Sequence, residues 1–378
     1  MFLMAVLLSA SVAVAADPPA GQITPDVKCD VDVSQSYALY LPSTYTPNRT
    51  WPVIFAFDPG GRGLNGVERY QAAAEQYGFI VAGSNNARNG QSSHDAVIAM
   101  SGDVIKRFHV DLTRIYVAGM SGGARVALGV ALASSTKVAG VMASSAGYPD
   151  GRSRKTLPFP LFETAGTEDF NHLEMRKIDR ELTTPHHLAI FEGGHLWLPS
   201  ALATEAVEWM EVQAMKTGLK PRDDKEVDQI FATRMKAVGP GKDKDTFLAL
   251  QALVDDFSGL KDVSALAVRA ADLGRSKSVV DALKSDRDED DREGHMLADV
   301  WAAEDRLMAA AEHADALTEL RQRWQKLSEQ AKKPDDAVER RLARRVLSGL
   351  SAGATTSNDE EYLKIVREFR MGRGGRGN

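Results

Sequence analysis

The chain has 378 residues, of which 43% are hydrophobic and 26% charged, as in soluble globular proteins. This length exceeds what one hydrophobic core usually organises, so we expect two domains. The formal net charge of −6 argues against nucleic acid or an anionic membrane surface as a partner.

Residues 1–16 form an apolar run that ends in the small residues Ala13, Ala15 and Ala16. The run is short for a transmembrane helix and has the layout of a secretory signal peptide cleaved after Ala15 or Ala16. It lacks the usual preceding Lys or Arg, and the alternative is a buried N-terminal helix. Because no second apolar run of transmembrane length follows, we expect a secreted or periplasmic protein with no stable membrane anchor.

From residue 17 to 217, short apolar runs alternate with amphipathic segments. Runs rich in β-branched and aromatic residues predict strands at 37–41, 53–57, 79–82, 114–118, 138–143, 161–164 and 187–191. The segments between them predict helices at 67–77, 94–108, 123–133, 173–181 and 202–215. Helix-length crossovers imply a mostly parallel sheet with helices on both faces, although the opening strands have connections short enough for antiparallel pairing.

Charged residues become about twice as frequent from Lys220 onward, and strand signals disappear. Helical periodicity replaces them, and it predicts an antiparallel all-α domain over residues 218–371. Its apolar positions recur within 247–253, 297–307, 317–327 and 342–350, and its breaks fall at 239–241, 259, 334 and 351–357. Residues 372–378 are rich in Gly and Arg, and this composition predicts a disordered tail.

A glycine-flanked serine follows the predicted strand at 114–118. The residues Gly119-Met120-Ser121-Gly122-Gly123 form a G-x-S-x-G pattern that leads into an Ala- and Val-rich helix. Between a strand and a helix, this pattern holds a serine on a sharp turn and exposes its hydroxyl at the helix N-terminus. Ser121 is therefore the candidate nucleophile; an idle serine in a glycine turn is the alternative.

The sequence around this turn resembles the α/β-hydrolase superfamily, and in particular secreted carboxylesterases of the polyhydroxyalkanoate depolymerase, feruloyl esterase and dienelactone hydrolase-like type. The resemblance covers residues 33–216 and does not include the helical half. It rests on the segments 37–42, 58–63, 111–123, 166–169 and 193–197. It implies an α/β-hydrolase fold and a catalytic triad in the chain order Ser, acid, His.

Two loops downstream supply the other candidate triad members. Asp169 follows the predicted strand at 161–164, where the family places its orienting acid, and Glu168 beside it is the rival. Either acid could instead cap the next helix. His195 follows the last predicted strand and the glycines Gly193 and Gly194, so it matches the family's base by chain order and loop position.

The resemblance also implies an oxyanion hole and a substrate pocket. The backbone N–H groups of Gly122 and Gly60 would hold the oxyanion, although Asp58-Pro59 replaces the family's usual His-Gly at the second position. Trp197 would wall the pocket. Asn85 and Asn86 either line the cleft rim or form a turn.

No cofactor or metal site is expected. Asp286, Asp288 and Asp290 begin like a calcium loop, but Asp291 occupies the turn-glycine position and Leu297 the final ligand position.

The first hypothesis for the function is a serine hydrolase that cleaves a small-molecule or polymeric ester, with peptide or thioester cleavage on the same triad as the alternative. A second hypothesis, of another class, is a binding or scaffold protein whose helical domain contacts a protein partner. The alternative role for the helical domain is structural: a solvated bundle that only packs against the hydrolase domain.

Overall fold

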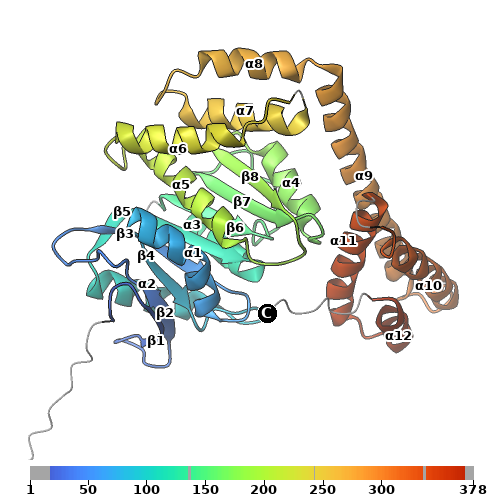
Figure 1. Ribbon diagram of the computed structural model, residues 1–378. Coiled ribbons are helices and arrows are strands. Elements are labelled where there is room, and N and C mark those ends of the chain that lie inside the picture. Colours follow the sequence, from blue (N-terminus) through green and yellow to red (C-terminus); the bar gives the residue numbers. More distant parts are fainter. Residues whose placement is uncertain (1–17, 135–137, 242, 335–337, 371–378) are drawn as a thin grey trace, which may run out of the picture.

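The computed structural model describes residues 18–134, 138–241, 243–334 and 338–370. All strands lie in the first part of the described chain, and helices alone follow the last strand (Figure 1). We call residues 18–217 the sheet half and residues 218–370 the helical half. The predicted signal peptide and the predicted tail at 372–378 lie outside the described residues.

The sheet has eight strands in the order β1-β2-β4-β3-β5-β6-β7-β8. The pairs β1–β2 and β2–β4 are antiparallel, and all others are parallel. This order is that of the α/β-hydrolase fold, and it confirms the predicted fold class. The strands are β1 (Ile23–Lys28), β2 (Ser36–Tyr40), β3 (Trp51–Phe57), β4 (Ile80–Ser84), β5 (Val110–Met120), β6 (Gly140–Ser144), β7 (Leu161–Gly166) and β8 (His186–Phe191).

Helices cover both faces of the sheet because alternate strand residues point to opposite sides. On one face, Ile54 and Phe162 belong to an apolar cluster closed by α1 (Gly63–Tyr77) and α5 (Ser200–Thr217). On the other face, a cluster that includes Val53 is closed by three helices. These are α2 (His94–Arg107), α3 (Gly122–Ala133) and α4 (His172–Glu181).

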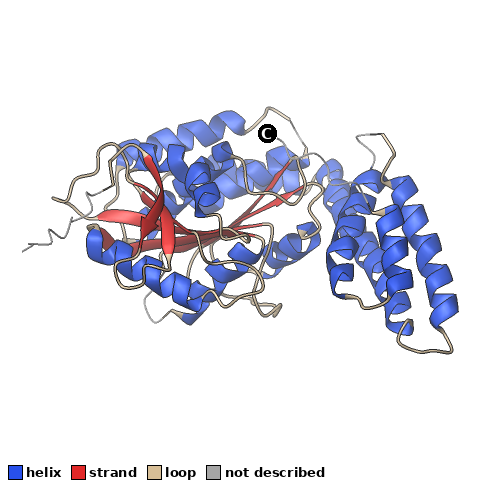
Figure 2. Cartoon of the chain, turned by 90° about the horizontal axis from the view of Figure 1, so that it is seen from below, coloured by secondary structure: helices blue, strands red, loops and turns tan. Residues whose placement is uncertain are grey.

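The helical half begins after α5 and ends in a four-helix bundle. Three helices, α6 to α8, follow α5, and Ile230 and Phe257 from them pack against Val212. The 30-residue α9 then leads to a bundle with α10, α11 and α12 around the buried Trp324 (Figures 1 and 2). The bounds are α6 (Asp224–Ala237), α7 (Lys244–Phe257), α8 (Ser264–Gly274), α9 (Lys277–Arg306), α10 (His313–Gln330), α11 (Val338–Gly353) and α12 (Glu360–Phe369).

Some elements differ from the sequence-based expectation. The strand β1 was not predicted, because it contains Pro25 and polar residues; it lies at the sheet edge, where proline is tolerated. The helices α6, α8 and α12 were also missed. The break expected from residue 351 comes later, since α11 continues to Gly353. Within the described part of the chain, no helix combines the length and apolarity needed to cross a bilayer.

Candidate active site

Ser121 lies on the turn between β5 and α3. Its φ is 54° and its ψ −124°, a backbone conformation that non-glycine residues rarely adopt. The turn is tight: a Cβ on Gly119 would lie 2.1 Å from the Gly123 carbonyl oxygen, and a Cβ on Gly123 1.9 Å from that of Phe57. The glycines therefore let β5, α3 and β3 approach each other, which explains the G-x-S-x-G spacing.

Ser121, His195 and Asp169 form one hydrogen-bonded line. Nε2 of His195 lies 2.8 Å from Oγ of Ser121, and Nδ1 lies 2.8 Å from Oδ1 of Asp169. An ionised Asp169 accepts from Nδ1–H, which leaves Nε2 free to accept the serine proton. The three residues follow β5, β8 and β7, so the parallel strands deliver them to the same edge of the sheet.

Asp169 is fully buried in the loop that joins β7 to α4, which we call the acid loop (residues 167–171). The Asn171 N–H donates to its Oδ1 at 2.9 Å, and Oδ2 has no hydrogen-bond partner among the described residues. The Phe170 ring stacks on the His195 imidazole, with ring centroids 4.0 Å apart. Backbone bonds from Thr167 to Phe191 and from Glu168 to Gly193 join the acid loop to the histidine loop.

Glu168, the rival acid, points to a different partner. Its two oxygens lie 3.0 Å from Nη1 of Arg340 and 3.0 Å from Nη1 of Arg344, both on α11. The structure therefore brings Asp169, and not Glu168, against the imidazole.

The two predicted oxyanion donors differ in their surroundings. Gly122 is the first residue of α3, so its N–H has no acceptor within the helix. The Gly60 N–H donates to Oδ1 of Asp58 at 2.8 Å, so it is not the free donor that the sequence suggested. The side chain of Asn89 instead lies against Gly122, where an added Cβ would be 1.6 Å from the Asn89 Oδ1 and 2.9 Å from its Nδ2.

Asp58 takes the Gly60 N–H because it organises the loop after β3. It also accepts from the Asn65 amide and from the Trp197 indole, each at 2.9 Å. Burial opposes its charge, but the hydrogen bonds from Trp197, Asn65 and Gly60 outweigh burial and hold the pKa of Asp58 below its usual value. Trp197 thus ties the histidine loop to the loop after β3.

Asn85 and Asn86 are engaged within the fold. The side-chain Oδ1 of Asn85 accepts from the Gly63 N–H at 3.1 Å, and Oδ1 of Asn86 accepts from the Ser36 N–H at 2.8 Å. The Asn85 amide also donates to the Pro25 carbonyl in β1 and the Ser36 hydroxyl in β2, and the Asn86 amide donates to the Ser34 carbonyl. Both side chains therefore bond to residues distant in the sequence, and Asn89 is the asparagine of this segment that lies against the serine turn.

A pocket of about 580 Å³ lies between the two halves, and Phe170, whose ring stacks on the His195 imidazole, is one of its lining residues. The sheet half contributes Phe170, Leu173 and Ile178, and the helical half contributes Leu297 and Trp301. Trp197 is not among its lining residues. Because Phe170 both lines the pocket and stacks on His195, the pocket begins one ring away from the hydrogen-bonded line.

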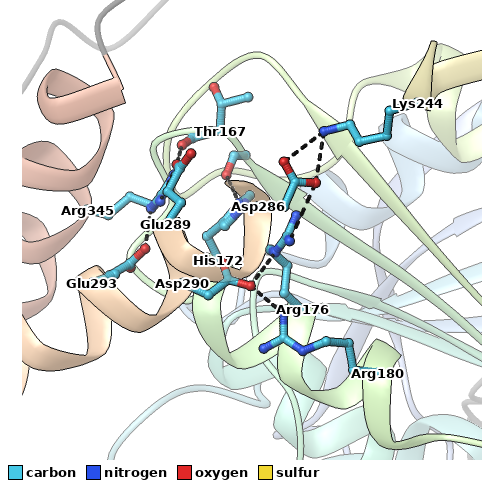
Figure 3. A network of polar contacts seen from close by, with 11 residues as sticks. Thr167, His172, Arg176, Arg180, Lys244, Asp286, Glu289, Asp290, Glu293 and Arg345 are labelled. Carbon is cyan, nitrogen blue, oxygen red and sulfur yellow. Dashed lines mark hydrogen bonds and ion pairs between the residues drawn. The ribbon is translucent and has the colours of Figure 1, made fainter. Parts of the chain in front are cut away.

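The acidic triplet of the helical half lies within α9. Asp286 pairs with Lys244 at 2.8 Å, and Asp290 pairs with Arg176 at 2.9 Å and with Arg180 (Figure 3). Among the residues that the structure describes, no three or more His, Cys, Asp or Glu side chains are grouped to hold a metal ion.

Comparisons with known proteins give only distant likenesses. No family model matches the sequence, and no curated protein is significantly similar to it. Among solved structures, the chain is similar to an S-formylglutathione hydrolase (FrmB) from Staphylococcus aureus, with 16% identity over 47% of this chain and 92% of that chain and a TM-score of 0.37.

Two further structures are similar over comparable lengths. A feruloyl esterase module from Clostridium thermocellum shares 15% identity over 50% of this chain and 87% of that chain, with a TM-score of 0.39. An esterase from the planctomycete Thermogutta terrifontis shares 16% identity over 54% and 97%, with a TM-score of 0.37. We assign the fold from the strand order of the sheet and not from these likenesses.

Proposed function

We propose that the protein is a serine hydrolase that cleaves a carboxylic ester, with Ser121 as nucleophile, His195 as general base and Asp169 as orienting acid. The observation that carries the proposal is the pair of 2.8 Å contacts that joins the three side chains. A serine hydroxyl is a poor nucleophile at neutral pH unless a base within hydrogen-bond reach accepts its proton.

The proposed reaction has two halves. Nε2 of His195 takes the hydroxyl proton while Oγ of Ser121 attacks the ester carbonyl carbon, and the carbonyl oxygen becomes an oxyanion. The C–O bond then breaks, the proton passes from His195 to the leaving alcohol, and an acyl-enzyme remains. Water then attacks the acyl carbon while Nε2 of His195 takes its proton. The bond between that carbon and Oγ of Ser121 breaks, the proton returns to Oγ, and the carboxylic acid leaves. Asp169 stabilises the transient imidazolium in both halves.

The oxyanion needs donors that are already in place. The Gly122 N–H is one, since it begins α3 with no helical acceptor. The Asn89 side chain lies against Gly122 with its amide oxygen nearest, so it would have to turn its Nδ2 group toward the oxyanion to supply the second donor, and the Gly60 N–H would first have to leave Asp58. No step in this sequence calls for a cofactor.

The pocket beside Phe170 supports an ester with an apolar group. Phe170, Leu173, Ile178, Leu297 and Trp301 give it a largely apolar wall. The same relay serves amide and thioester cleavage, so matched peptide and thioester substrates belong in the test. We further infer export of the protein from the apolar run at residues 1–16.

The experiment compares Ser121→Ala with the parent protein on p-nitrophenyl acetate and butyrate. Loss of the nucleophile should lower kcat by about 10³-fold or more and abolish labelling by a fluorophosphonate probe. Ser101→Ala is the matched control, because that hydroxyl bonds to the Val97 carbonyl within α2. Unchanged turnover and labelling in Ser121→Ala would refute the proposal.

A further inference from the structure

The acid loop contacts the helical half directly, through one face of α11. The carbonyl oxygen of Thr167 accepts from Nη1 of Arg345 at 2.9 Å. Glu168 pairs with Arg340 and Arg344, as described above. Two consecutive residues of the loop, immediately before Asp169, are therefore held by three arginines of a helix more than 170 residues away in the sequence.

The loop is also touched by α11 immediately after Asp169. A Cβ added at Gly349 would lie 3.4 Å from the Cβ of Phe170, an ordinary van der Waals distance, so the backbone of α11 passes close to that residue. Phe170 in turn stacks on the His195 imidazole. Contacts with α11 thus flank Asp169 on both sides along the chain.

Arg345 is a fixed group and not a mobile surface cation. Its side chain is 2% exposed, and Nε lies 2.7 Å from Glu293 while Nη2 lies 3.0 Å from Glu289 (Figure 3). Both carboxylates come from α9. An arginine stays charged at all working pH values, and its planar fork directs each N–H. The remaining Nη1–H is therefore aimed at the Thr167 carbonyl by the two bonds to α9.

The helix that follows the acid loop is held from the same side. Arg176 on α4 bonds Asp290 at 2.9 Å, and Arg180 on α4 contacts the same carboxylate (Figure 3). His172, in the first turn of α4, joins the two ends of the acid loop, because its Nδ1 lies 3.0 Å from the carbonyl oxygen of Gly166. Burial lowers the pKa of His172 to about 4, so the ring is neutral and donates this bond.

We propose that the helical half positions the catalytic acid, with Arg340, Arg344 and Arg345 of α11 as positioning residues. The proposal rests on the function proposed above. A displacement of a catalytic group by about 1 Å can cost about 10²-fold in rate, so the orientation of a buried carboxylate on a loop is worth this much support. The helical half is then part of the catalytic apparatus, although none of its residues touches the reacting atoms.

The test uses Glu168→Gln in the full-length protein. This change removes the charge of both ion pairs with α11, preserves the side-chain size and leaves Asp169 in place. We expect kcat for p-nitrophenyl butyrate to fall about tenfold with KM unchanged. Arg344→Gln should do the same, and the double variant should lose little more than the larger single loss, because the two residues act through one contact. Arg344→Lys should recover part of the rate.

A second readout reports the geometry without turnover. The imidazole Nδ1 proton held by Asp169 should give a far-downfield proton NMR signal in the parent protein. This signal should broaden or move in Glu168→Gln. The matched control is Arg321→Gln, which breaks an ion pair of 2.7 Å with Glu368 elsewhere in the bundle and should leave both the signal and kcat unchanged.

The outcomes separate the two proposals. Parent-like kcat and an unmoved signal in Glu168→Gln and Arg344→Gln, with Ser121→Ala inactive, would overturn the positioning role and leave the triad standing. Turnover retained in Ser121→Ala would instead overturn the proposed function, while a shifted signal in Glu168→Gln would still support positioning of the Asp169–His195 pair. Arg345→Met is unsuited as the primary variant, because it leaves the buried Glu293 unpaired and should destabilise the bundle.

Discussion

The sheet half and the helical half bury their side chains in different ways. The sheet half has two extended apolar clusters, one on each face, that hold large side chains such as Trp51, Phe162 and Trp209. The apolar residues of the helical half belong to three smaller clusters, one of which also includes Val212 and Met215 of α5. Its contact with α4 and the acid loop consists largely of ion pairs, with Asp290, Glu293 and Arg345 almost fully buried.

This difference separates two ways of holding a site. Ser121 and His195 are fixed by strands whose backbone ladders and apolar packing set their positions. The loop that carries Asp169 depends in addition on charged side chains from the other half. Removing one partner of a buried ion pair leaves the other charge buried and unpaired, which costs several kcal/mol. Substitutions in the helical half should therefore affect the acid loop more than they affect the loops that carry Ser121 and His195.

The largest expected effect comes from truncating one core residue in each half. Phe162 in β7 and Trp324 in α10 are both 0% exposed, and replacement by Ala should cost about 3–5 kcal/mol in each case. Phe162→Ala should weaken the sheet and the site together. Trp324→Ala should unfold the bundle at a lower urea concentration than the sheet half. Ser121 should then still be labelled by the probe, and kcat for ester substrates should be reduced.

Urea unfolding followed by circular dichroism, with fluorophosphonate labelling at each urea concentration, measures both variants. One shared transition in Trp324→Ala would show that the two halves unfold as a single unit and are not held independently.

A smaller effect concerns the buried charge at the boundary. Burial raises the pKa of Glu293 to about 7 from an ordinary value of 4.5, although Arg345 opposes the shift. The folded state then holds this proton more tightly than the unfolded state. The contribution of Glu293 to stability is therefore fully present below about pH 4.5 and is lost as the pH rises to about 7, by at most about 3 kcal/mol.

Glu293→Gln should remove that decline, because the amide carries no proton to lose in this range. Urea midpoints of the parent and the variant at pH values between about 5 and about 8 give the slope. Glu360→Gln, at the exposed start of α12, is the matched control and should keep the parental slope. A slope unchanged in Glu293→Gln would mean that other groups set the pH dependence.

The smallest expected effect lies in the pocket that both halves line. Trp301 is 53% exposed and lines this pocket together with Phe170 and residues of α4. Trp301→Ala should raise KM for butyrate or benzoate esters about fivefold, which corresponds to about 1 kcal/mol of lost apolar contact. Acetate esters, whose acyl group is two carbons shorter than butyrate, should be affected less. Leu248→Ala, an exposed apolar residue of α7, serves as control; equal effects on all esters would place the substrate elsewhere.

The sequence predicted what depends on local pattern. The turn at Ser121 and the loops of Asp169 and His195 each follow an apolar strand and contain small flanking residues, so their positions at one sheet edge could be inferred. Strand β1 was missed because Pro25 interrupts its pattern. Phe170 was missed although it is adjacent to Asp169, since nothing in a single sequence indicates which ring stacks on the imidazole.

Other features depend on contacts that no local pattern reports. The Gly60 N–H is occupied because Asp58 turns back on it, and Trp197 faces that carboxylate instead of the pocket beside Phe170. Asn89 and not Asn85 or Asn86 reaches Gly122, which follows from the path of a loop. In the sequence, the arginines of α11 indicate only a charged face of a helix. Their contacts with the acid loop depend on the tertiary fold, which brings segments more than 170 residues apart together.

The long helix α9 carries its acidic residues in a fixed register. Asp286, Glu289, Asp290 and Glu293 recur at intervals of three and four, so they form one stripe, and that stripe faces inward toward cations of α4, α7 and α11. Inserting a single residue between Asp286 and Glu293 would turn the following segment by about 100° and break the match between the stripe and its cations. Families of related chains should therefore vary in the loops around α9 and hold its length constant.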